Sequence, residues 1–130
     1  MAILDPQQEL FTEARTMLAE QFDVYDGALP PDGTPYPFIY LADTQQVDDL
    51  SNKSAVMADI YLTVHLWGDD VEKRGTFSGI LLDVKNIVRS ITQSAHYSFS
   101  LRGCDQRILN DNTTSTPLLH GVLEFHFILH

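Results

Sequence analysis

The stretch LLHGVLEFHFIL, residues Leu118–Leu129, is the clearest structural signal in the chain, because apolar residues recur at every second position. Successive side chains of a β-strand point to opposite faces of a sheet, so this alternation predicts a half-buried strand. We expect its apolar face to pack against helices. That face comprises Leu119, Gly121, Leu123, Phe125, Phe127 and Leu129, and the opposite face comprises His120, Val122, Glu124, His126, Ile128 and His130.

A second long strand is predicted over Ser54–Trp67, again from alternation of apolar and polar residues. A short strand is expected at Phe22–Tyr25 and another at Phe38–Leu41, on either side of the proline-rich loop Leu29–Pro37. The polar segment Asp43–Ser54 has no clear period and predicts a long loop. The second long strand alternates Ile60, Leu62, Val64 and Leu66 with Tyr61, Thr63, His65 and Trp67.

Two helices are predicted on either side of these strands. The first begins at Asp5–Pro6, a capping residue followed by proline at the first helical position, and ends near Glu20–Phe22. The second follows the acidic stretch Asp69–Glu72. Gly75 and Gly79 within it indicate either a close approach to the sheet or a loose first turn. The apolar stripes are Leu10, Phe11, Ala14 and Leu18 in the first helix, and Phe77, Ile80, Leu81, Val84, Val88 and Ile91 in the second.

The segments that precede the last strand complete the predicted fold. His96–Arg102 and Cys104–Asn110 are expected to be two paired strands with Gly103 near their turn, and Asp111–Pro117 a polar turn. The sequence therefore predicts an α+β fold, in which a mainly antiparallel sheet of about five strands has two helices packed on one face. The length of 130 residues fits one domain, residues 1–130.

Composition narrows the classes of function. The formal net charge is −10, and residues 1–50 hold ten acids and one base, so most of the negative charge lies in the first part. This balance argues against binding of a nucleic-acid backbone, which needs clustered Lys and Arg. No apolar run is long enough to span a membrane, and no secretory signal peptide is expected. With Cys104 as the only cysteine, no intrachain disulfide can form, which favours a reducing compartment.

Candidate chemistry is sparse. One predicted strand face carries His120, Glu124, His126 and His130, and His65 could lie on a neighbouring strand. Such residues could bind a transition metal. However, side chains on one strand point in parallel and do not converge on a common ion. The alternative is a polar or interfacial surface. Other single candidates, each with a structural alternative, are Cys104 and Ser115 as nucleophiles and Asp48–Asp49 or Asp69–Asp70 as cation ligands. Gly75–Gly79 lacks the lysine of a phosphate-binding loop. We therefore predict no catalytic residue, no metal site and no cofactor, and no enzymatic function.

The order of several short motifs resembles one known family. Leu29-Pro30 is followed by Tyr-Pro-Phe-Ile at Tyr36–Ile39, by Thr-Val-His-Leu-Trp at Thr63–Trp67, and by the last strand opening near His120–Phe125. Over about residues 6–128 the chain resembles the tail completion proteins of long-tailed siphophages, also called tail-to-head joining or tail terminator proteins. The acidic Gly68–Asp70 departs from the pattern, because a Gly or Ser and basic residues usually follow the tryptophan.

The resemblance implies a virion structural protein at the head–tail interface, present in the host cytoplasm before assembly. Such a subunit forms a ring with copies of itself, commonly a hexamer, which caps the tail tube protein and offers a surface to the head connector or head-closure protein. DNA would pass through without specific binding, and no membrane takes part. Two alternatives stay open: another phage assembly factor, such as a head-closure or minor tail protein, and a small metal-dependent enzyme that uses the histidine face.

A ring through which DNA passes suggests a role for the acidic first part of the chain. Carboxylates along a channel repel phosphates and let a duplex slide. We take Asp43, Asp48 and Asp49 as candidates for the subunit or channel surface. The alternative is that these acids lie outside the ring and only keep the subunit soluble.

Overall fold

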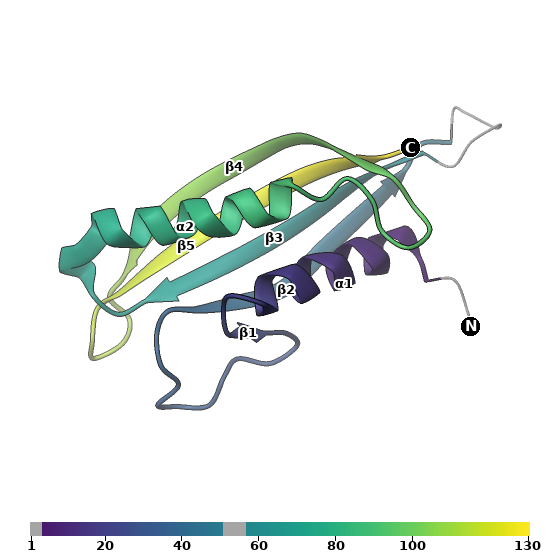
Figure 1. The fold of residues 1–130 in the computed structure, drawn as a ribbon. Coiled ribbons are helices and arrows are strands. Elements are labelled where there is room, and N and C mark those ends of the chain that lie inside the picture. Colours follow the sequence, from purple (N-terminus) through teal and green to yellow (C-terminus); the bar gives the residue numbers. More distant parts are fainter. Residues whose placement is uncertain (1–3, 51–56) are drawn as a thin grey trace.

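The computed structural model describes residues 4–50 and 57–130 of the chain. The described part of the chain has two α-helices, and Figure 1 shows that they lie over one face of a long, twisted sheet. Neither described helix combines the length and the apolar composition that a membrane span requires. In chain order the elements are α1 (Pro6–Ala19), β1 (Val24–Tyr25), β2 (Phe38–Asp48), β3 (Ala58–Gly68), the short 3-10 helix η1 (Val71–Lys73), α2 (Arg74–Arg89), β4 (Phe99–Asp111) and β5 (Leu118–Leu129).

Over the described residues the sheet has five strands in the order β1-β2-β3-β5-β4. The two-residue strand β1 pairs with β2 in parallel, and every other neighbouring pair is antiparallel. The predicted α+β class is therefore confirmed, with two helices and five mostly antiparallel strands. The division of the strands differs from the prediction, because three strands precede α2 and two follow it, not three.

The last strand β5 lies inside the sheet, between β3 and β4, and its predicted faces are confirmed. All six residues of its apolar face are buried, and all of them except Gly121 join one core cluster with apolar residues of α1 and α2. Val122 is also buried, at 4% exposure, although it lies on the opposite face. Its cross-strand neighbours there are His65 and Arg107.

The helix α2 approaches the sheet at two glycines of the strands, not at its own glycines. A Cβ added to Gly121 would lie 2.9 Å from Cδ1 of Leu81, and one added to Gly68 would lie 2.7 Å from Cδ1 of Phe77. Around Gly75 and Gly79 nothing lies within 4 Å of the same position. Of the two alternatives for the helix glycines, the close approach is therefore wrong.

The helix α1 begins as predicted. Oδ2 of Asp5 accepts a hydrogen bond from the backbone N–H of Gln7 at 3.0 Å, and Pro6 is the first helical residue. The backbone and the side chain of Gln7 both bond this end of the helix to β2. Its backbone N–H donates to Oε1 of Gln46 at 3.1 Å, and its amide donates to the hydroxyl of Thr44.

The predicted loop Asp43–Ser54 is wrong over its first half. Residues 43–48 continue β2 and pair with β3, from Thr44 opposite Leu62 to Asp48 opposite Ala58. The register shifts between Leu41 and Thr44, so an extra residue interrupts the apolar alternation there and hides the strand from pattern reading. Residues 51–54 of the predicted loop lie outside the described residues.

The two predicted strands around Gly103 are one strand. β4 runs from Phe99 to Asp111 and pairs with β5 along its whole length, with a register shift between Leu101 and Gly103. Gly103 therefore marks an irregularity in a continuous strand and not a turn, because the chain does not reverse direction there. The predicted turn at Asp111–Pro117 is confirmed between β4 and β5, apart from Asp111 itself, which ends β4.

Candidate functional site

The face of the sheet that the helices leave uncovered carries the predicted histidines. Tyr61, His65 and Trp67 come from β3, and His120 and His126 come from β5. The two strands are neighbours in antiparallel register, with Tyr61 opposite His126 and Trp67 opposite His120. Sequence reasoning thus identified the members of this face, and the pairing decides which of them meet.

One group on this face is a stack of rings around His120. The indole of Trp67 lies parallel to the His120 ring with centroids 3.9 Å apart and planes 6° apart. Nδ1 of His65 lies 2.8 Å from Nε2 of His120, at hydrogen-bonding distance. Burial, and secondly the charge of nearby His65, lower the pKa of His120 from 6.5 to about 4. The His120 ring is therefore neutral at pH 7, and one of the two rings donates a hydrogen bond to the other.

The other histidines of the predicted cluster have separate partners. Nε2 of His126 lies 2.7 Å from Oδ1 of Asp59, and the ring stacks on Tyr61 with centroids 4.5 Å apart. Nε2 of His130 lies 2.6 Å from the hydroxyl of Ser100. In the described part of the chain, no group of three or more His, Cys, Asp or Glu side chains is placed to hold a metal ion. The histidines of this face therefore contact separate neighbours, as the side chains of a polar surface do.

The remaining chemical candidates lie apart from one another. Cys104 is partly buried on β4, and burial raises the pKa of its thiol above the ordinary value. Ser115 lies in the exposed turn between β4 and β5. Asp70 accepts a hydrogen bond from the backbone N–H of Glu72 at 3.1 Å, which makes it a cap of the short helix η1. None of these contacts forms a nucleophile–base pair.

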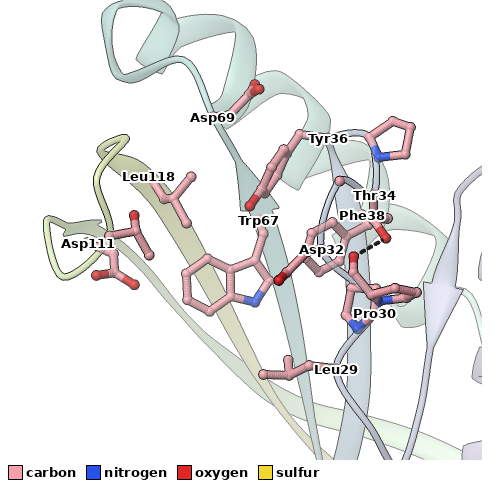
Figure 2. A pocket seen from close by; sticks show the side chains of 14 residues that line it. Leu29, Pro30, Asp32, Thr34, Tyr36, Phe38, Trp67, Asp69, Asp111 and Leu118 are labelled. Atoms are coloured by element: carbon pink, nitrogen blue, oxygen red, sulfur yellow. Dashed lines mark hydrogen bonds between the residues drawn. The ribbon is translucent and has the colours of Figure 1, made fainter.

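A pocket of about 610 Å³ lies on the same side of the sheet, at the end where β3 stops (Figure 2). One wall is the proline-rich loop, residues 29–36, and the other is formed by the end of β4 and the start of β5, at Asp111 and Leu118. Trp67 lies between these walls, and Phe38, its cross-strand neighbour, lies beside it. The pocket therefore joins parts of the chain that are far apart in sequence.

The proline-rich loop has a defined local conformation. Thr34 donates hydrogen bonds from its backbone N–H and its hydroxyl to the carbonyl oxygen of Pro31, at 3.2 and 2.6 Å. Gly33 adopts a positive φ of 85°, which suits glycine because a Cβ would be strained there. The ring of Tyr36 lies against Phe38 with centroids 5.2 Å apart, and the Tyr36–Pro37 peptide bond is cis. The loop is thus an ordered wall of the pocket.

Of the three acidic candidates, Asp43 lies apart from the neighbouring residues Asp48 and Asp49. Asp43 lies at the register shift of β2, with its side chain 76% exposed and Oδ2 3.8 Å from Nε2 of His65. Asp48 ends the same strand, roughly 16 Å further along at about 3.3 Å per residue, and accepts a hydrogen bond from Gln46 at 2.8 Å. Asp49 donates its backbone N–H to the carbonyl oxygen of Met57 at 2.9 Å. Their channel role stays a prediction.

Solved structures with the same fold include a chain of a gene transfer agent virion. A chain from the virion of a native gene transfer agent particle matches with a TM-score of 0.64 and 18% sequence identity, over 95% of this chain and 93% of that chain. A second solved structure matches with a TM-score of 0.51 and 13% identity, over 95% of this chain and 89% of that one. No protein-family model matches the chain, and no curated protein does either. At these identities the likeness shows a common fold.

Proposed function

We propose that this chain is a structural protein of the virion of a phage or phage-like particle. The observation that carries the proposal is the shared fold with a chain of a gene transfer agent virion, which extends over 95% of this chain and 93% of the other. The order of short motifs that resembles tail completion proteins supports the same class of protein, and it does not rest on the shared fold. Within the virion we propose the head–tail junction, where the subunit caps the finished tail tube.

The open edge of the sheet supports a subunit that assembles with copies of itself. β4 has 13 residues and, in the described part of the chain, pairs along its length with β5 alone. The other side of β4 therefore presents backbone donors and acceptors that an adjoining chain can satisfy. A contact between unlike surfaces of identical copies closes into a ring when the rotation fits. We propose such a ring, commonly of six copies in the family that the chain resembles.

The proposed ring meets two kinds of partner. The tail tube protein lies on one side, and the head connector or head-closure protein lies on the other. The formal charge of −10 per copy fits a passage that lets DNA through without retaining it, since retention needs Lys and Arg. Asp43, Asp48 and Asp49 are our candidates for part of that passage.

Deletion of the gene from its phage or prophage tests the proposal. Electron microscopy of the particles should show normal heads together with tails that are abnormal in length or not joined to heads. A plasmid copy of the wild-type gene should restore joined particles, whereas the Phe125→Asp variant should not, because Phe125 is fully buried. Joined particles of normal length without the gene would refute the proposal. Heads that lose their DNA beside normal tails would instead indicate a head-closure protein.

A further inference from the structure

The pocket around Trp67 has an aromatic interior and an acidic lining. Trp67, Phe38 and Tyr36 supply three aromatic rings, and Asp32, Asp69 and Asp111 supply three carboxylates. Figure 2 shows these side chains around a common space, with the indole in the middle. Among the described residues that line the pocket there is no Lys, Arg or His.

Aromatic rings together with carboxylates favour a positively charged ligand. An aromatic face attracts a cation that lies over it, and carboxylates at the rim add ordinary electrostatic attraction. An anion or a nucleic-acid backbone would be repelled from the same space. We propose that this pocket binds an arginine side chain that a partner polypeptide presents, stacked on the indole of Trp67.

The surroundings of Trp67 favour this geometry. His120 covers one face of the indole at a centroid distance of 3.9 Å, so the ring is held in a fixed plane. The same Trp67 side chain lines the pocket, and His120 is not among the described residues that line it. Because the His120 ring is neutral at pH 7, it adds no positive charge that would oppose a guanidinium. A planar guanidinium stacks on an indole and binds carboxylates with two parallel N–H donors, whereas an ammonium acts as a compact point charge.

One carboxylate of the lining, that of Asp111, is held in its charged form by neighbouring hydrogen-bond donors. Asp111 accepts hydrogen bonds from the hydroxyl and the backbone N–H of Thr113, at 2.6 and 2.9 Å. These two bonds lower the pKa of Asp111 below its ordinary value of 3.8. Asp32 and Asp69 are exposed at the rim. A cation that enters the pocket therefore meets negative charge from both walls.

The size and rim of the pocket indicate a polypeptide and not a small cation. A volume of about 610 Å³ leaves room for the residues that flank an inserted side chain. Leu29 is 68% exposed and Tyr36 is 37% exposed at the rim, and both offer apolar area to the main chain of a partner. Interfaces between proteins concentrate Trp, Tyr and Arg at such places. The inference rests on this geometry and does not depend on the virion role.

The single tryptophan of the chain reports directly on the pocket. The purified full chain is titrated with the peptide acetyl-Gly-Arg-Gly-amide while Trp67 emission is recorded. We expect a saturable change of emission, with an affinity for the arginine peptide at least about fivefold above that for acetyl-Gly-Gln-Gly-amide, since the two peptides differ by the cation. No saturable change with the arginine peptide, or equal affinities for the two peptides, would overturn the proposal.

Matched variants distinguish binding in the pocket from a general attraction of the peptide to the negative surface. Asp32→Asn with Asp69→Asn removes two carboxylates of the rim, and Asp83→Asn with Asp105→Asn removes two exposed carboxylates elsewhere, on α2 and β4. We expect the first pair to weaken arginine-peptide binding roughly fivefold or more, and the second to change it less than about twofold. Equal losses in both pairs would overturn the assignment. All variants should keep the wild-type circular dichroism, because the four positions are exposed.

Two further titrations exclude other occupants. Spermidine carries several ammonium groups but no polypeptide, and tighter binding of spermidine than of the arginine peptide would overturn the proposal. Dilution of the protein alone should leave Trp67 emission per molecule unchanged. A change with concentration would assign the pocket to a second copy of the chain and would equally overturn it.

Discussion

Nδ1 of His96 lies 2.7 Å from Oε2 of Glu9, and this contact joins α1 to the segment between α2 and β4. Glu9 is buried at 5% exposure, and its other oxygen accepts hydrogen bonds from the hydroxyl of Ser94 at 2.6 Å and the backbone N–H of His96 at 3.0 Å. Burial alone would raise the pKa of Glu9, but these hydrogen bonds outweigh burial and hold the pKa below the ordinary 4.5.

The first prediction concerns this carboxylate. Because its pKa is lower in the folded than in the unfolded chain, Glu9 adds stability that is present above pH 4.5 and is lost as the pH falls further. Glu9→Gln should lower the melting temperature by several degrees at pH 7 and should flatten the loss of stability below pH 4.5. Thermal denaturation across pH measures both. Glu20→Gln, at an exposed position, is the control. If Glu9→Gln changed the melting temperature and its pH dependence no more than Glu20→Gln does, the account would be contradicted.

The second prediction concerns His120. Its pKa is about 4 when folded and 6.5 ordinarily, so between these values the unfolded chain binds more protons than the folded one. Stability from the neutral ring is therefore complete above pH 6.5 and is lost as the pH falls toward 4. We expect the ring protons of His120 in NMR spectra to titrate with a midpoint near 4. In His120→Gln, stability should depend less on pH within this window. A midpoint near 6.5 would show that the His120 ring is not buried beside His65 in solution.

The third prediction compares two glycines. Gly68→Ala places a methyl group 2.7 Å from the ring of Phe77, and a rigid ring beneath a helix cannot yield cheaply, so we expect a loss of about 1–3 kcal/mol. Gly79→Ala meets nothing within 4 Å inside α2 and should stabilise by up to about 1 kcal/mol. Urea denaturation measures both values. Equal effects of the two substitutions would mean that α2 does not pack on Gly68.

Local patterns predicted the elements of this fold well where burial is strictly periodic. The apolar face of β5 and the stripe of α2 follow from spacing alone, because their apolar side chains lie in or against the core, although Val122 on the opposite face of β5 is buried as well. Prediction failed where the register shifts, at Leu41–Thr44 in β2 and Leu101–Gly103 in β4, because one extra residue reverses the alternation. The interrupted alternation then predicts a loop or a turn where the strand is continuous.

The pocket around Trp67 could not be predicted in the same way. Its walls come from residues 29–36 and from the ends of β4 and β5, and only the strand order β1-β2-β3-β5-β4 brings them together. Alternation along a strand carries no information on strand order. The available signal was the ordered proline-rich loop and a tryptophan at the end of a strand. Similarly, Glu9 lies on a helix face that the apolar stripe predicts to be polar, and its partners are more than 80 residues away.

The fourth prediction concerns the acidic candidates of the proposed channel. Replacing Asp43, Asp48 and Asp49 by lysine would place cations where DNA is proposed to pass, and phosphate attraction would slow ejection. We expect joined particles that release their genome slowly, with the defect relieved by salt, because salt screens the attraction. The matched asparagine variants should eject at a rate close to wild type. If the lysine variant also ejects normally, these three residues lie outside the passage.

The central proposal is that this chain is part of a finished virion, and within it of the head–tail junction. Purified particles, separated into heads and tails and analysed by quantitative mass spectrometry, test this most directly. A single cyclic ring at the junction predicts about six copies per particle, in constant ratio to the other virion proteins. Absence of the chain from purified virions of a phage whose lysate contains it, or hundreds of copies per particle, would contradict the claim.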